Sequence, residues 1–140
     1  MPFSDPTSTA WEPLLGSAWE AWARAYAPYS GFRVGAAVLL ADGRIVPGCN
    51  VENASYPLGQ CAERAAVCAA VSLGAAVGQL RALAVVTAAG ALTPPCGACR
   101  QVLAEFAEDL PILLANRTER SLCTIAELLP RAFTGRHLAR

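Results

Sequence analysis

The chain has 140 residues, 54% of them hydrophobic, and its 11 acidic and 11 basic residues give a formal net charge of zero. A chain of this size folds as one domain that buries roughly two-thirds of its unfolded surface, while the balanced charge and the lack of a basic run argue against a protein that binds nucleic-acid phosphates. Every basic residue counted is arginine, which excludes a Walker A lysine and a lysine Schiff base.

The first half of the chain predicts a helix followed by a hairpin. Residues 1–10 are rich in Pro, Ser and Thr and are predicted to be loose, which leaves a single domain over residues 11–140. Apolar residues about four apart predict a helix over residues 12–26. Two strands over residues 34–40 and 44–51 follow, joined by an Asp-Gly turn that is typical of a hairpin.

The second half alternates helices with strands. The predicted elements are a helix over residues 61–73, a strand over 83–87, a helix over 96–108, strands over 111–115 and 122–125, and a short helix over 126–129. This order predicts an α/β fold with one mixed, five-stranded sheet and helices on both faces. No stretch reaches about 18 unbroken apolar residues, so a membrane span is not indicated.

Two short stretches hold a cluster of chemistry-bearing residues, Cys61 and Glu63 in one and Cys96 and Cys99 in the other. Each stretch lies at the predicted N-terminus of a helix, where free N–H groups and the helix dipole favour thiolates. Zn²⁺ with three protein ligands keeps its fourth position for water, whereas a structural site normally fills all four. Glu63 is then placed to move protons to and from that water.

Simpler interpretations exist for each of these residues taken alone. A cysteine is often a small buried side chain, a lone C-x-x-C can be a redox pair, and a glutamate in a first helical turn is often a capping residue. The joint pattern favours a catalytic zinc site, because H-x-E together with P-C-x-x-C is the signature of zinc nucleobase deaminases, with cysteine allowed in place of histidine.

The remaining cysteines and the single histidine are predicted to lie outside this site. Cys68 is about 10 Å along the helix axis from Cys61, too far to share one ion, and is predicted to be in the core. Cys49 and Cys123 are predicted to be buried thiols in strands, although Cys49 could still lie near the metal. His137 is predicted to be a solvated tail residue, which argues against a Ser-His-Asp triad. Reduced thiols and the lack of a signal peptide indicate a cytoplasmic protein.

From about residue 12 to Phe133, the chain resembles the small, homotetrameric, three-cysteine cytidine deaminases. The matching stretches are residues 28–37, 48–57, 61–64 and 95–102. The resemblance implies a three-layer α/β/α fold and a bound Zn²⁺. It also implies hydrolytic deamination of cytidine and 2′-deoxycytidine to uridine and 2′-deoxyuridine, with release of ammonia, in pyrimidine salvage.

The resemblance implies a role for each matched residue. Zinc would be held by Cys61, Cys96 and Cys99, Glu63 would transfer protons, and Arg64 would hydrogen-bond the metal thiolates. The substrate contacts would be Phe32 at the base, Asn50 and Glu52 at the ribose 3′-hydroxyl, Ala62, and, reaching in from a neighbouring subunit, Tyr56 and Phe133. Without the resemblance, the polar pair would be assigned to turn chemistry and the phenylalanines to the core.

The helix over residues 61–73 also predicts self-association, because only Glu63, Arg64 and Ser72 are clearly polar in it. A helix that is apolar nearly all round must be covered on every side, which indicates an obligate oligomer. The expected partners are a nucleoside and other copies of the chain, with no nucleic acid or membrane. Two alternatives remain: a deaminase of another cytosine-like or aminopurine compound, and a non-enzymatic zinc-stabilised interaction domain, in which Glu63 would be dispensable.

Overall fold

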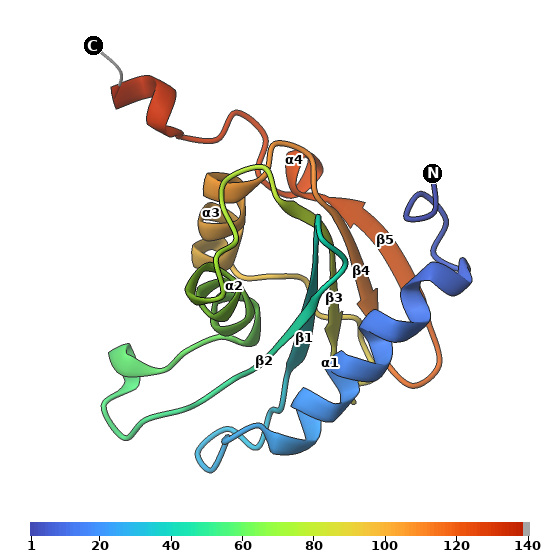
Figure 1. Cartoon of the computed structure of the whole chain (residues 1–140). Coiled ribbons are helices and arrows are strands. Elements are labelled where there is room, and N and C mark those ends of the chain that lie inside the picture. Colours follow the sequence, from blue (N-terminus) through green and yellow to red (C-terminus); the bar gives the residue numbers. More distant parts are fainter. Residues whose placement is uncertain (139–140) are drawn as a thin grey trace.

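The computed structural model describes residues 1–138, which contain a mixed sheet of five strands in the order β2-β1-β3-β4-β5 (Figure 1). The strands are β1 (Gly35–Leu40), β2 (Ile45–Cys49), β3 (Leu80–Val86), β4 (Pro111–Ala115) and β5 (Arg120–Thr124). Strands β3 and β4 pair in parallel and the other neighbours pair antiparallel. The prediction of one mixed, five-stranded sheet is therefore confirmed.

Helices cover both faces of this sheet, so the predicted three-layer arrangement is also confirmed. Figure 1 shows α1 on one face and α2 and α3 on the other. The helices are α1 (Glu12–Arg24), α2 (Ala62–Ser72), α3 (Gly97–Phe106) and the short α4 (Ile125–Leu128), with 3-10 turns η1 (Thr9–Trp11), η2 (Tyr56–Leu58) and η3 (Gly135–Leu138). Successive residues of β1 face opposite layers: Ala36 and Val38 pack under α2, and Ala37 packs under α1.

Two glycines let helices lie directly on strand backbones. A Cβ atom built at Gly35 would lie 2.0 Å from the Ala18 carbonyl oxygen of α1. At Gly48 it would lie 2.4 Å from the Ala66 nitrogen and 2.5 Å from the Ala62 carbonyl oxygen of α2. The first turn of α2 is therefore positioned by backbone contact with the edge strand β2.

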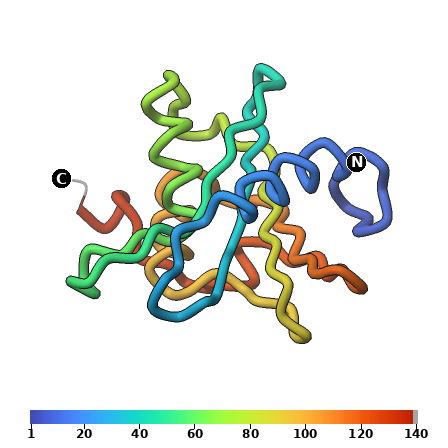
Figure 2. Tube along the Cα trace, turned by 90° about the horizontal axis from the view of Figure 1, so that it is seen from below, coloured from blue at the N-terminus to red at the C-terminus, as the bar shows by residue number. Residues whose placement is uncertain are grey.

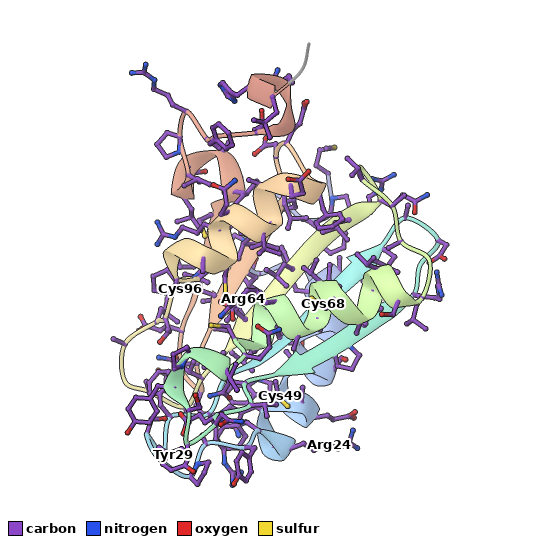
Figure 3. The ribbon with its side chains drawn as sticks, turned by 90° about the vertical axis from the view of Figure 1, so that its left-hand side faces the viewer. Arg24, Tyr29, Cys49, Arg64, Cys68 and Cys96 are labelled. Carbon is purple, nitrogen blue, oxygen red and sulfur yellow. The ribbon has the colours of Figure 1, made fainter. Side chains whose placement is uncertain are left out.

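Several predictions of detail differ from the structure. The helix predicted to reach residue 26 ends at Arg24, because Ala25 has an extended ψ of 140°. Strand β3 begins at Leu80 rather than at residue 83, because Leu80 is buried and pairs with Leu40 across a register shift. The prediction that Cys68 is a core residue is wrong: it is exposed on α2 (Figure 3). An apolar helix gives no periodicity from which the exposed face could be chosen.

The first ten residues make defined contacts in the structure. The Phe3 ring packs edge-on against Trp11 with centroids 4.9 Å apart. Trp11, itself fully buried, donates a hydrogen bond from Nε1 to the Asp5 carbonyl at 3.2 Å. These contacts place residues 1–10 against the α1 layer, while their looseness and the domain boundary at residue 11 stay predictions.

Strand β2 forms one edge of the sheet, and the exposed Pro47 lies in its middle, opposite Ala37 of β1. The loop that carries η2 and the segment that carries η3 both project from the α2 and α3 side (Figures 1 and 2). The N-terminal segment lies on the opposite side of the molecule.

Within residues 1–138, every helix is too short or too polar to span a bilayer.

Candidate metal and catalytic site

Three thiols converge where α2 and α3 begin. The Sγ atoms of Cys61, Cys96 and Cys99 all lie within 4.8 Å of one another, with 3.9 Å between Cys61 and Cys96 and 3.6 Å between Cys96 and Cys99. Tetrahedral zinc with Zn–S bonds near 2.3 Å places its sulfur ligands roughly 3.8 Å apart. The spacing and the thiolate character of this group therefore fit zinc.

The thiols lie at the N-termini of two helices, as predicted. Cys61 is the N-cap residue of α2, Cys96 is the N-cap residue of α3, and Cys99 lies in the first turn of α3. Arg64 adds a positive charge, donating from Nη2 to Cys61 Sγ at 3.3 Å, and Figure 3 shows Arg64 beside the end of α3 that carries Cys96. The dipoles of the two helices and the Arg64 guanidinium group together stabilise negative charge on the thiols.

Cys61 and Cys99 influence each other's pKa in opposite directions. A hydrogen bond with Cys99 is the largest influence on Cys61 and lowers its pKa to about 5, and Arg64 adds to this effect. The same hydrogen bond, together with burial, raises the pKa of Cys99. Without a metal, the cluster therefore holds a thiolate stabilised by neighbouring protons. A divalent ion must displace those protons, so its affinity should fall as the pH falls.

Glu63 lies beside the cluster and is 5% exposed. Burial raises the pKa of its carboxyl group, and negative charge on Cys61 raises it further. The carboxyl group shares a cavity of about 290 Å³ with two of the thiols. That cavity is lined by Val34, Asn50, Val51, Glu52, Gly59, Gln60, Cys61, Ala62, Glu63, Thr93, Pro94 and Cys96.

The cavity continues past Glu52 and Gly59 into a second hollow, which is also lined by Tyr29, Ser30, Asn53 and Tyr56. Two carboxylate groups, Glu52 and Glu63, line the two hollows. Within residues 1–138, no arginine lines either hollow. The volume is at the small end of the range for ligand pockets. The arrangement suits a small, uncharged polar molecule.

Asn50 and Glu52 hold the loop before β1, in addition to lining the cavity. Asn50 donates from Nδ2 to the Phe32 carbonyl at 2.8 Å and accepts the Val34 N–H at 2.8 Å. Glu52 Oε1 accepts the N–H groups of Tyr29 at 2.9 Å and Ser30 at 3.1 Å. These contacts correspond to the turn chemistry considered as the alternative. Within residues 1–138, each side chain still keeps unused hydrogen-bonding capacity, one N–H on Asn50 and carboxylate lone pairs on Glu52.

The Ser30 hydroxyl donates to Glu52 Oε2. This bond is the largest of the influences that lower the pKa of Glu52, followed by the bond from the Ser30 N–H. Glu52 is therefore an ionised acceptor at neutral pH.

The remaining substrate residues expected from the resemblance divide into two groups. Ala62 is buried and lines the cavity. Phe32, Tyr56 and Phe133 are exposed by 42%, 76% and 58%. The Phe133 ring stacks on His137, with centroids 5.3 Å apart. Tyr56 lines the second hollow. Phe32 and Phe133 line neither hollow, so within one chain these two side chains are not brought to the cavity.

Among the polar residues that line the two hollows, sequence reasoning missed Tyr29, Ser30, Asn53, Gln60 and Thr93. The signal for Gln60 is its position next to Cys61, and Ser30 lies inside the matched stretch 28–37. Thr93 comes from the loop before α3, and its sequence surroundings carry no signal for a site.

The other cysteines and the histidine lie apart from the thiol cluster. Cys49 and Cys123 are half-buried rather than buried, and burial raises the pKa of Cys123. In residues 1–138, the group able to hold a metal consists of the three cysteines named above and does not include Cys49. His137 is exposed in η3, as predicted.

Comparison with known sequences decides the family. Residues 10–113 match the family model described as the cytidine and deoxycytidylate deaminase zinc-binding region. The chain belongs to this deaminase family. Its zinc-binding region contains the thiol cluster described above, so zinc is the metal of the site.

Individual members of the family are similar over most of the chain. The cytidine deaminase of Mycobacterium tuberculosis is 52% identical over 124 residues, which are 88% of this chain and 89% of that protein. The cytidine deaminase of Sporosarcina psychrophila is 46% identical over 130 residues, covering 91% and 94%. The crystal structure of the Burkholderia pseudomallei cytidine deaminase superposes with a TM-score of 0.84 at 44% identity, covering 87% of this chain and 98% of that one.

Proposed function

We propose that the protein hydrolyses cytidine and 2′-deoxycytidine to uridine and 2′-deoxyuridine with release of ammonia, as a step of pyrimidine salvage in the cytoplasm. The observation that carries this proposal is a buried carboxyl group, Glu63, sharing a small cavity with a three-thiol zinc site. Relatives named cytidine deaminase support the choice of substrate. The direct test is loss of the ultraviolet absorbance of cytidine, with one ammonia released per turnover, on adding purified protein.

The reaction needs an activated water and controlled proton transfer. Cys61, Cys96 and Cys99 would hold the zinc, which when bound would supply Lewis-acid activation of water near neutral pH. Glu63 takes one proton from the water that attacks C4 of the cytosine ring and passes it to N3, then takes the second proton from the hydroxyl formed at C4 and passes it to the departing amine. Ammonia leaves and the C4 carbonyl of uridine forms. Burial of Glu63 keeps bulk water from competing in these transfers.

Recognition of the sugar is assigned to Asn50 and Glu52. The unused N–H of Asn50 and the carboxylate of Glu52 offer one donor and one acceptor, which match the 3′-hydroxyl of a ribose. Phe32 is assigned to the base. These sugar contacts favour a nucleoside over the alternative substrates, another cytosine-like or aminopurine compound, and a substrate panel separates them.

We expect 3′-deoxycytidine to have a specificity constant roughly 100-fold below that of cytidine, because it loses the hydrogen bond to the ionised Glu52 carboxylate and the one from Asn50. 2′-Deoxycytidine is the matched control and should remain close to cytidine, since it keeps the 3′-hydroxyl. Steady-state kinetics on the three nucleosides and on free cytosine measure this difference. Equal specificity constants for cytosine and cytidine would remove Asn50 and Glu52 from the site.

Assembly into a homotetramer with shared sites is the second part of the proposal. On α2, Val71 is 43% exposed and Leu73 just after it is 54% exposed, so apolar surface faces away from the sheet. Tyr56 and Phe133 are exposed on the two projecting segments. A neighbouring subunit would cover the α2 surface, and the projecting aromatics would complete its cavity.

Light scattering should give about four times the chain mass of 14.6 kDa. Mixing tests the shared site: Glu63→Gln and Phe133→Ala chains, each impaired alone, should gain activity when refolded together, because some cavities then combine an intact Glu63 with an intact Phe133. An active monomer, or mixtures no better than the sum of their parts, would contradict sharing through Phe133.

A further inference from the structure

The loop before β1 is organised around one hydroxyl group, that of Ser30. It donates to Oε2 of Glu52 and accepts the N–H of Phe32 at 2.9 Å. The turn is closed by a hydrogen bond from the Gly31 N–H to the Ala27 carbonyl at 2.9 Å, and Gly31 has a φ of +67°. A single side chain therefore joins two residues assigned to opposite ends of the substrate, the base and the sugar.

The Ser30 hydroxyl helps to fix the orientation of the Glu52 carboxylate. A hydroxyl has one hydrogen, and here that hydrogen is committed to Oε2. Oε1 already accepts two backbone N–H groups, from Tyr29 and Ser30. Both carboxylate oxygens are thus held, and rotation of the carboxylate would break three hydrogen bonds. The lone pairs that remain free belong to a group in a defined orientation, at the junction of the two hollows that Glu52 lines.

We propose that Ser30 is a positioning residue for sugar recognition, which acts by holding the Glu52 carboxylate in the orientation that accepts the ribose 3′-hydroxyl. The inference rests on the proposed function. Ser30 lines the second hollow and does not line the cavity that contains Glu63 and the thiols. Removing the Ser30 hydroxyl should therefore weaken sugar binding through Glu52 and leave the chemistry at C4 unchanged.

The alternative is that Ser30 supports the loop only through the Phe32 N–H. The two routes predict different substrate dependence. Loss of Glu52 orientation penalises a substrate that has the 3′-hydroxyl and spares one that lacks it. Displacement of Phe32 penalises both substrates equally, because both carry the same base.

The test compares Ser30→Ala with wild type on cytidine and 3′-deoxycytidine. We expect KM for cytidine to rise roughly 10- to 100-fold, the range for a hydrogen bond to a charged group, with kcat within about twofold. The specificity constant for 3′-deoxycytidine should change by less than about threefold, so the wild-type preference for cytidine should largely disappear. Ser30→Thr, which keeps the hydroxyl, should recover most of the loss, and zinc content should stay near one per chain.

Ser121→Ala, at an exposed position of β5, is the matched control and should behave as wild type. Equal losses on both nucleosides, or no loss on either, would overturn the role of Ser30 while leaving the proposed function standing. A wild-type protein that does not turn over cytidine would overturn both. Loss of zinc in Ser30→Ala would also count against the inference, because it would show that the hydroxyl supports the whole site.

Discussion

Glu63→Gln is expected to bind close to one zinc per chain and to lose on the order of 10⁴-fold in kcat for cytidine, the upper range for a general acid–base group. The amide has nearly the same size and still fills the buried position, but it cannot accept a proton from water or deliver one to N3. The Glu63 carboxylate is not among the metal ligands, so the zinc site of the Glu63→Gln variant should remain intact. Turnover and metal analysis on the same preparation measure both quantities.

Two further variants make this result specific. Cys96→Ala should lose activity together with zinc, because two thiols remain from a three-thiol site. Glu105→Gln, on the exposed face of α3, changes the same functional group away from the cavity and should leave both quantities unchanged. Near-normal turnover by Glu63→Gln would refute the mechanism, whereas a zinc-loaded wild-type protein without turnover would favour the non-enzymatic, zinc-stabilised domain.

Gly48→Ala should lower the free energy of unfolding by about 3 kcal/mol, the upper end of the usual cost of overpacking. The added methyl group would lie 2.4 Å from the Ala66 nitrogen and 2.5 Å from the Ala62 carbonyl oxygen. Both are backbone atoms and cannot rotate aside, so α2 has to move off the sheet. Since the first turn of α2 carries Cys61 and Glu63, zinc affinity and kcat should fall as well.

Urea unfolding of the zinc-loaded protein, with parallel zinc titration, measures these changes. Gly16→Ala is the matched control, because a Cβ at Gly16, within α1, meets nothing within 4 Å. Alanine is about 1 kcal/mol more favourable than glycine inside a helix, so this variant should be as stable as wild type or more stable. A Gly48→Ala protein with unchanged stability would show that α2 is not held by this backbone contact.

The thiol cluster could be predicted from sequence because its signals are local. The proline pair before Cys96 and the helical spacing after Cys61 set both helix starts, and the structure confirms that these starts converge. By contrast, the Glu52 contacts join residues 22 and 23 positions apart in the chain. Such long-range hydrogen bonds leave no periodic signal, so the resemblance suggested only the substrate role of Glu52 and not its role in holding the loop.

The exposed face of α2 was also beyond prediction, for a different reason. A helix with few polar residues has no marked polar side, and the choice between core and surface for Cys68 then depends on how the helix lies on the sheet. Gly48 decides that placement by letting one side of α2 reach β2. Cys68 is therefore left on the outer side.

Pro47 in the edge strand β2 affects how copies of this chain can associate. An exposed strand edge is a template on which another chain can add a strand, the route by which many proteins aggregate. Proline has no N–H with which to bond an incoming strand, so it interrupts the row of donors on β2. A protein whose outer helix is apolar must be able to meet its own copies without polymerising. Because the β2 edge is interrupted, association between copies through side chains is favoured over strand addition. Side-chain interfaces of this kind can form a closed oligomer with a fixed number of subunits.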